Sequence, residues 1–135
     1  MTHRSLLPIA LGAALVLGAL SHALAGDTTA VQQQARWTAE ASAPANAARG
    51  QSFFTSRHGG EWSCASCHGQ PPTADGKHTS TGKSIAPLAP AFNAKAFTDA
   101  AKADKWFRRN CKDVLSRECS AAEKADVLAY LNSLK

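Results

Sequence analysis

Apolar residues recur with the 3.6-residue period of an α-helix in three stretches of this chain, and the first stretch follows Asn46. This residue can cap a helix that runs to Ser56, in which Gly50, Phe53 and Phe54 share one face at i, i+3, i+4 spacing. A glycine inside a helix costs about 1 kcal/mol relative to alanine. We therefore expect a second helix to cross closely at Gly50.

The second stretch predicts a helix from about Thr98 to Asn110, with Thr98 or Asp99 as its cap. Its periodic positions are Ala103, Trp106, Phe107 and Asn110. Asn110 is therefore expected on the same face as Trp106.

The third stretch is the C-terminal helix, which begins with the capping box Ser120-Ala121-Ala122-Glu123. Its apolar stripe consists of Val127, Leu128, Leu131 and Leu134. The chain has no internal repeat and no strand-like alternation, so we expect an all-α fold.

Residues 70–97 contain four prolines and two glycines and show little periodicity. A structureless stretch of this length is uncommon in a compact domain and usually serves a function. Wrapping a flat cofactor is one such function.

The N-terminus carries the features of a secretory signal peptide over residues 1–25. A short basic start leads into an apolar run rich in Leu and Ala, and Ala23-Leu24-Ala25 forms the cleavage site. The apolar run is shorter than the roughly 20 residues of a membrane-spanning helix. Residues 26–45 are polar and Ala-rich, with Val31 and Trp37 as their large apolar side chains, and are expected to form a loosely ordered leader with at most one helical turn.

Composition adds little beyond this outline. The whole chain has a net charge of +5, and removal of the signal peptide, which contains Arg4, lowers it to +4. A net charge this small does not indicate a nucleic-acid partner, whereas a mildly positive surface suits docking to an acidic redox partner. The remaining domain is so small that its hydrophobic core alone would give only marginal stability, and a buried prosthetic group would enlarge that core.

The sequence Cys64-Ala65-Ser66-Cys67-His68 is the C-x-x-C-H signature of c-type haem attachment. Two thiols at this spacing add to the two vinyl groups of one porphyrin, and the adjacent His68 can ligate the iron. A thioredoxin-like dithiol would be expected near a βαβ pattern, which this chain lacks. A zinc site would need a second closely spaced pair of ligands, but Cys111 and Cys119 lie far apart.

The arrangement of these features resembles class I cytochromes c over residues 46–135. The resemblance rests on the helix with Gly50 and Phe53-Phe54, the C-x-x-C-H motif, the Pro-rich loop and a last helix ending in LAYLNSL. It implies the all-α class I cytochrome c fold, with one covalently attached haem c and with the first and last helices of this domain crossing.

The second axial ligand of the iron cannot be the usual methionine, because the chain's only methionine is Met1, in the signal peptide. The residues alone leave several candidates open: His58, His78, Lys77, Lys83, Asn93 and Asn110. His78 would give a bis-His haem. Asn110 could equally be the C-cap of its helix.

Two observations favour Asn110: it shares a face with Trp106, and it immediately precedes Cys111. In an oxidising compartment Cys111 and Cys119 are candidates for a disulfide, with two buried free thiols as the alternative. Such a disulfide would close a nine-residue loop and stabilise the fold by about 2.5 kcal/mol in the chain-entropy model.

Residues 81–131, and above all the segments WFRRNC and REC, resemble the sphaeroides haem protein family, SHP. Its members are oxygen-binding class I cytochromes c with an asparagine axial ligand and an adjacent disulfide. The resemblance implies that His68 and Asn110 ligate the iron and that Cys111 pairs with Cys119. Trp106, on the same helix face as Asn110, is expected in the haem pocket. The resemblance also implies a dihaem cytochrome c as electron donor.

Two hypotheses follow for the function of this exported, periplasmic protein. In the first, the reduced haem iron binds oxygen or nitric oxide after Asn110 is displaced. In the second, the protein is an electron-transfer cytochrome with fixed ligation by His68 and His78. Enzymatic turnover has weaker support, because no distal His and Arg pair is evident, although Arg108 and Arg109 lie near.

Overall fold

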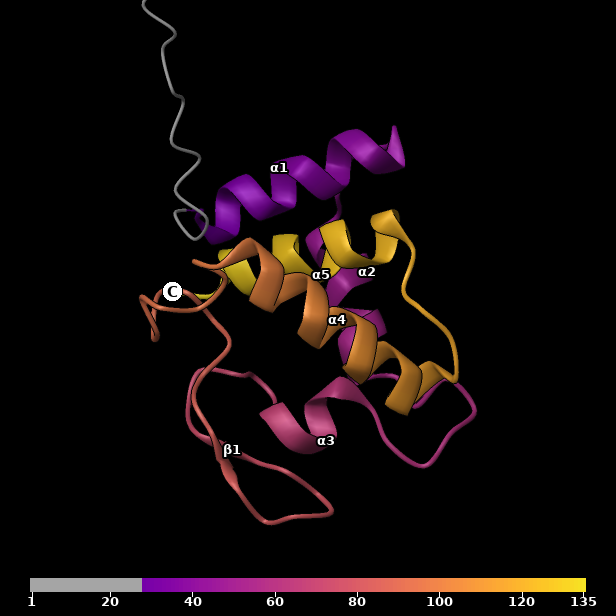
Figure 1. Cartoon of the computed structure of the whole chain (residues 1–135), viewed down its shortest axis with the longest axis vertical. Helices are drawn as coiled ribbons and strands as arrows, with labels where there is room; N and C mark the ends of the chain where they lie inside the picture. Colours follow the sequence, from indigo (N-terminus) through magenta and orange to yellow (C-terminus); the bar gives the residue numbers. More distant parts are fainter. Residues whose placement is uncertain (1–27) are drawn as a thin grey trace, which may run out of the picture.

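The computed structural model describes residues 28–135, and the signal peptide predicted over residues 1–25 lies outside them. The described part is helical apart from one short antiparallel hairpin (Figure 1), which confirms the all-α prediction. In chain order the elements are α1 (Ala30–Ala41), α2 (Ala47–Thr55), α3 (Cys64–His68), β1 (Gly76–Lys77), β2 (Ser84–Ile85), α4 (Ala100–Leu115) and α5 (Ala121–Ser133).

Helix α2 begins and ends close to the positions expected from the sequence. The side chain of Asn46 accepts a hydrogen bond from the Arg49 backbone N–H, as an N-cap should. Gly50 is buried where α2 meets α5, and a Cβ atom at this position would clash with the backbone of Asp126. The close crossing expected at Gly50 is therefore present.

The region expected to be a loosely ordered leader instead contains the regular helix α1. Thr29 caps it through a capping box with Gln32, and the buried face consists of Ala30, Gln33 and Trp37. This face packs along α5. The helix is stable because Trp37 is buried against the C-terminal helix, a tertiary contact that the local sequence does not reveal.

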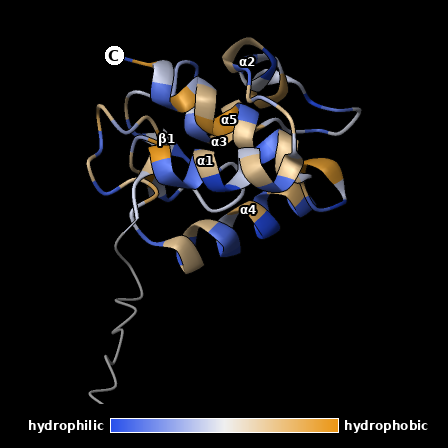
Figure 2. Cartoon of the chain, turned by 90° about the horizontal axis from the view of Figure 1, so that it is seen from above, coloured by the Kyte–Doolittle hydropathy of each residue, from blue (hydrophilic) through white to orange (hydrophobic). Residues whose placement is uncertain are grey.

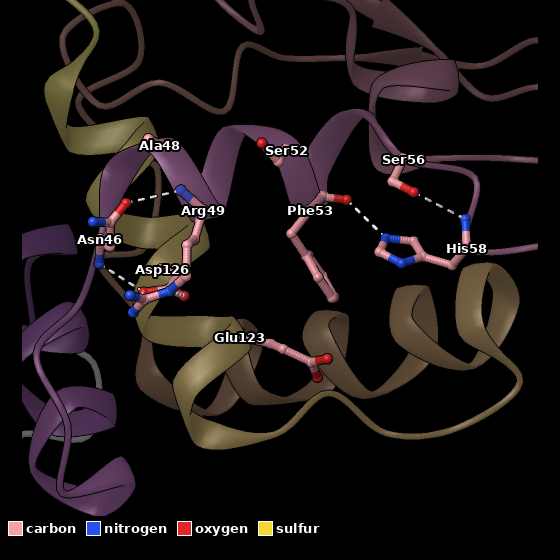
Figure 3. Close-up of a pocket in the computed structure, with 9 residues that line it drawn as sticks. All are labelled: Asn46, Ala48, Arg49, Ser52, Phe53, Ser56, His58, Glu123 and Asp126. Atoms are coloured by element: carbon pink, nitrogen blue, oxygen red, sulfur yellow. Dashed lines mark hydrogen bonds and ion pairs between the residues drawn. The ribbon is translucent and has the colours of Figure 1, made fainter.

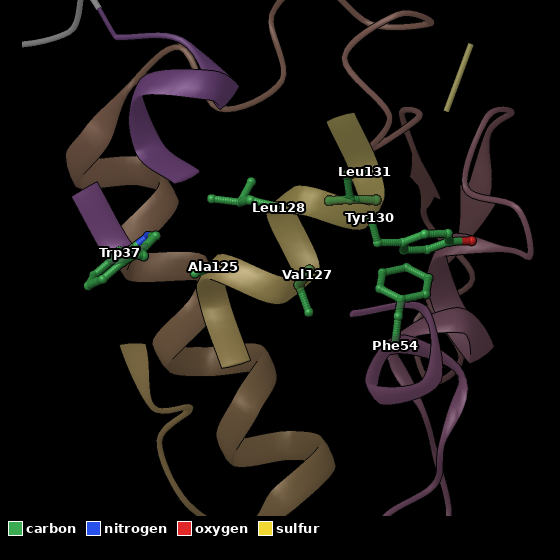
Figure 4. Packing of buried hydrophobic residues seen from close by; sticks show 7 residues of the cluster. All are labelled: Trp37, Phe54, Ala125, Val127, Leu128, Tyr130 and Leu131. Carbon is green, nitrogen blue, oxygen red and sulfur yellow. The ribbon is translucent and has the colours of Figure 1, made fainter. Parts of the chain in front are cut away.

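Helix α5 forms the centre of the core. Its capping box, predicted from Ser120 and Glu123, is present, and both α1 and α2 pack against it. Figure 4 shows Trp37 at one end of the resulting cluster and Phe54 with Tyr130 at the other, where their ring centroids lie 5.7 Å apart. The buried cluster comprises Trp37, Phe54, Ala125, Val127, Leu128, Tyr130 and Leu131.

Helix α4 is longer than the sequence predicted. Asp99 is its N-cap, but the helix continues past Asn110 to Leu115 and ends at Ser116 in the left-handed conformation. Asn110 is therefore an interior helical residue and not a C-cap. Polar and apolar stretches alternate along α4 in the hydropathy colouring of Figure 2. In Figure 1 the helix runs between α1 on one side and α3 with the hairpin on the other.

Within residues 28–135, no helix has the length and apolar character that a membrane crossing requires.

Candidate functional site

The C-x-x-C-H motif forms the single-turn helix α3. Ser63 caps it, and the reciprocal hydrogen bonds between Ser63 and Ser66 form a capping box. Cys64 and Cys67 are three residues apart and so lie on the same face of this short helix. The two thiols are not bonded to each other.

Burial favours the uncharged forms of Cys64 and His68. Desolvation by burial raises the pKa of the Cys64 thiol to about 11. Burial, followed by the charge of His78, lowers the pKa of His68 to about 4. At neutral pH, His68 is therefore a neutral imidazole with a free lone pair, which is the form that binds a metal.

The Nδ1 atom of His68 is buried and has no hydrogen-bond partner among the described residues. A buried ring nitrogen without a partner is costly in a protein that binds nothing at that point. Its position fits a site that is completed by a further group.

A large cavity opens beside α3. It has a volume of about 1110 Å³, which is at or above the upper end of the roughly 300–1,000 Å³ of ordinary small-molecule pockets. Apolar side chains from α2, α4, α5 and the Pro-rich loop contribute to its lining, among them Phe54, Leu88, Phe107, Val127 and Leu131. A cavity with these walls and with a C-x-x-C-H turn at one side fits a covalently attached haem.

The structure brings the predicted haem-site residues to this one cavity: Cys64, Cys67, His68, Trp106 and Asn110. The other axial candidates divide into two groups. His78, Lys83 and Asn93 line the cavity, whereas His58 and Lys77 do not. His58 instead donates from Nε2 to the Phe53 carbonyl at 2.8 Å, in the tautomer that this acceptor requires.

Two of the cavity-lining candidates use their side chains in local hydrogen bonds. The Asn93 amide donates to the Pro87 carbonyl at 2.8 Å. His78 Nδ1 accepts from the Thr81 backbone N–H at 3.2 Å, so that in the neutral ring Nε2 carries the proton. A ring nitrogen that carries a proton has no lone pair for iron.

Asn110 differs from both, because its side-chain amide makes no hydrogen bond with the residues that the structure describes. The next residue, Cys111, is bonded to Cys119, with the two Cα atoms 5.6 Å apart. This disulfide joins the end of α4 to the start of α5. It fixes the backbone beside a free amide that faces the cavity.

Trp106 lies one turn before Asn110 and is 45% exposed. Its ring is flanked by two cations, with Arg109 Cζ 5.3 Å and Lys105 Nζ 5.9 Å from the ring centroid. Trp106 therefore lines the cavity while part of its ring stays open to solvent, next to these two cations.

A second hollow, of about 580 Å³, lies between α2 and the start of α5 (Figure 3). Its main feature is the Asp126 carboxylate, which accepts from Arg49 Nε at 2.7 Å and from the Asn46 backbone N–H at 2.6 Å. These bonds tie the start of α2 to α5. Sequence reasoning missed this link, because residues 49 and 126 are not related by any local pattern.

Comparisons with known proteins place the chain among haem proteins. Residues 40–131 match the family described as Domain of unknown function (DUF1924). The chain is 49% identical over 113 residues to the cytochrome c-type protein SHP of Cereibacter sphaeroides, covering 81% of this chain and 87% of that protein. It is 47% identical over 78 residues to cytochrome c'' of Methylophilus methylotrophus, covering 58% of this chain and 54% of that protein.

Solved structures agree with these sequence matches. Oxidised SHP, described as an oxygen-binding cytochrome c, superposes with a TM-score of 0.75 at 46% identity and covers 81% of this chain and 100% of that one. Oxidised cytochrome c'' of Methylophilus methylotrophus superposes with a TM-score of 0.67 at 37% identity and covers 78% of this chain and 94% of that one.

Proposed function

We propose that this chain, which belongs to the family of c-type cytochromes that includes SHP and cytochrome c'', binds a diatomic gas at the reduced haem iron. Like its relatives, the chain carries covalently attached haem c. Oxygen or nitric oxide is the ligand, and Asn110 is the axial ligand that leaves. The observation that carries the proposal is the unpartnered Asn110 amide in the wall of the haem cavity.

Three residues of α3 hold the cofactor in this proposal. Cys64 and Cys67 form the thioether links, and His68 is the proximal ligand. The haem would supply an iron that exchanges one electron and binds additional ligands. The neutral state of the buried His68 imidazole supports its role as a ligand.

Asn110 acts as both ligand and gate. A neutral amide oxygen is a hard donor, so it favours ferric over ferrous iron. Reduction of the iron would therefore weaken the hold of Asn110 on it. Once released, the Asn110 side-chain N–H can donate a hydrogen bond to a gas molecule in the cavity.

The walls of the cavity support binding of a neutral diatomic. Phe107, Val127 and Leu131 are apolar, and Val127 and Leu131 are almost fully buried. Apolar walls on this side of the cavity would disfavour the loss of bound oxygen as a charged product.

The outer face of α4 supports an acidic redox partner. Lys105, Arg108 and Lys112 follow one another at i, i+3, i+7 spacing, are exposed and do not line the cavity. A row of cations attracts and orients an acidic protein surface. The resemblance to SHP suggests a dihaem cytochrome c as that partner, and export by the predicted signal peptide would place the protein in the periplasm, where the Cys111–Cys119 disulfide is stable.

The alternative is an electron-transfer cytochrome with His68 and His78 as ligands. It is favoured by the position of His78 in the cavity lining, close enough for its charge to lower the pKa of His68. Against it stands the hydrogen bond that Nδ1 of His78 accepts from Thr81. In addition, the hairpin that carries His78 packs closely on α3, because a Cβ atom at Gly76 would lie 2.1 Å from the backbone oxygen of Cys67. This close packing leaves the hairpin little room to move His78 toward the iron.

Absorption spectra of the oxidised and reduced holoprotein, each with and without carbon monoxide, separate the two functions. Carbon monoxide should shift the reduced spectrum of the wild type. Asn110→Ala should alter the ferric spectrum, and Asn110→Met should give a higher-potential protein that resists carbon monoxide. If His78→Ala altered the ferric spectrum and Asn110→Ala did not, bis-His ligation would replace the gas-binding proposal.

A further inference from the structure

Helix α4 is attached to the rest of the protein differently from the other long helices. Both α1 and α2 pack along α5, whereas α4 shares no broad helix-to-helix contact within residues 28–135. One of its sides faces the haem cavity instead. Phe107 packs against the core cluster, and a small number of specific links add to this contact in holding the helix that carries Asn110.

The first link joins α4 to α1. The two helices begin side by side, where the Thr28 backbone N–H donates to the Thr98 carbonyl at 3.3 Å, and they diverge from there (Figure 1). Farther along, the Arg36 guanidinium donates two hydrogen bonds to the Asp104 carboxylate, Nη1 to Oδ2 at 3.2 Å and Nη2 to Oδ1.

Arg36 is better placed for this contact than an ordinary surface arginine. Its guanidinium lies 3.8 Å from the ring centroid of Trp37, and Trp37 is itself 5% exposed and packed against α5. A side chain that is already ordered loses less entropy when it forms an ion pair. The Arg36–Asp104 pair therefore connects α4, through a fixed indole, to the core of the protein.

The second link is the disulfide between Cys111 and Cys119. Asp104 and Cys111 are seven residues apart, so both links lie along the same line of α4. Asn110 lies about a third of a turn away from that line and six residues, or about 9 Å, beyond Asp104. Two anchors on one line determine how α4 is rotated about its own axis, and a single anchor does not.

We propose that Arg36 and Asp104 are positioning residues that hold α4 in the rotation at which the Asn110 amide faces the haem iron. This inference rests on the function proposed above. Without the pair, α4 keeps the disulfide and the packing of Phe107 against the core cluster, but its first half loses the side-chain link to α1, and Asn110 yields more easily to an incoming ligand.

The test compares Arg36→Gln and Asp104→Asn with wild-type holoprotein at low salt. Hydrogen exchange measured by mass spectrometry reports on the backbone amides of residues 100–110 and does not depend on a signal from the iron. Cyanide binding to the ferric protein reports on how easily the distal ligand is displaced. Each variant should exchange faster in this segment and should bind cyanide up to about five-fold more tightly, which corresponds to the upper range for a surface ion pair.

Two further comparisons make the result specific. The double variant Arg36→Gln/Asp104→Asn should match either single variant, because both break one pair. High salt should move the wild type toward the variants, because a partly exposed pair is screened. Arg117→Gln is the matched control, since it breaks another two-bond arginine pair, with Glu123, that does not involve α4, and it should leave both measurements unchanged.

The inference is wrong if Arg36→Gln and Asp104→Asn match the Arg117→Gln control in exchange and in cyanide affinity, or if their effects add in the double variant. Asn110→Ala, measured in parallel, separates this outcome from failure of the proposed ligation. If Asn110→Ala leaves the ferric spectrum and the cyanide affinity unchanged, the proposed ligation is wrong, and so is the role assigned to the pair.

Discussion

A Cβ atom placed on Gly50 would lie 1.9 Å from the backbone oxygen of Asp126. Helices α2 and α5 therefore cross at a point where a hydrogen atom fits and a methyl group does not. Because the opposing atom belongs to the backbone of α5, a rotamer change cannot relieve the contact.

Gly50→Ala should therefore destabilise the protein although alanine is the better helix former. Overpacking against a fixed backbone should outweigh the gain of about 1 kcal/mol in helix propensity. We expect a net loss of about 2 kcal/mol or more in the free energy of unfolding, measured by urea titration of the holoprotein. Ala48→Gly, on the exposed side of α2, is the control and should lose only about 1 kcal/mol. An unchanged or raised stability in Gly50→Ala would contradict the close crossing.

The covalent attachment of haem can be tested at Cys64 and Cys67. Either Cys→Ala variant should lose most of its haem stain on a denaturing gel, because each thiol forms one of two thioether links. The double variant should keep none. The control is the double Cys→Ser variant at Cys111 and Cys119, which should retain full stain. Full retention of stain in the Cys64/Cys67 double variant would refute the c-type assignment.

The disulfide between Cys111 and Cys119 should be present in protein isolated without reductant. Alkylation without reductant, followed by mass spectrometry, should label neither thiol. Reduction, or the double Cys→Ser variant, should lower the free energy of unfolding by about 2.5 kcal/mol, because a nine-residue loop is released. It should also perturb the ferric spectrum through the backbone beside Asn110. Two labelled thiols in unreduced protein would mean that the bridge does not form.

Helix α1 should contribute substantially to stability through Trp37. Trp37→Ala should lower the free energy of unfolding by about 3–5 kcal/mol, since it removes a large buried ring. Trp37→Phe should cost much less, because the lost indole N–H has no hydrogen-bond partner among the described residues. Val31→Ala is the control, as Val31 is 65% exposed. Thermal unfolding that is equally insensitive to all three changes would show that α1 does not belong to the folded core.

Sequence patterns were most successful where the relevant residues are close together in the chain. The caps at Asn46 and Ser120 act over three residues, and the structure contains both. Helix α1 was missed for a related reason. Its buried face includes the polar Gln33, while the apolar Val31 is exposed. The sequence of α1 therefore does not show the periodic apolar positions of an amphipathic helix, and its helical state depends on packing against α5.

The sequence by itself determined the chemistry that depends on local spacing: a C-x-x-C-H turn, and the lack of any methionine after Met1. It could not decide which of six candidate side chains reach the cavity. Tertiary structure decided that Asn110 and His78 line it while His58 and Lys77 do not, and it paired Arg36 with Asp104 across 68 residues of chain. The physical reason is that backbone geometry fixes neighbours a few residues apart, whereas contacts between distant residues form only when whole helices pack.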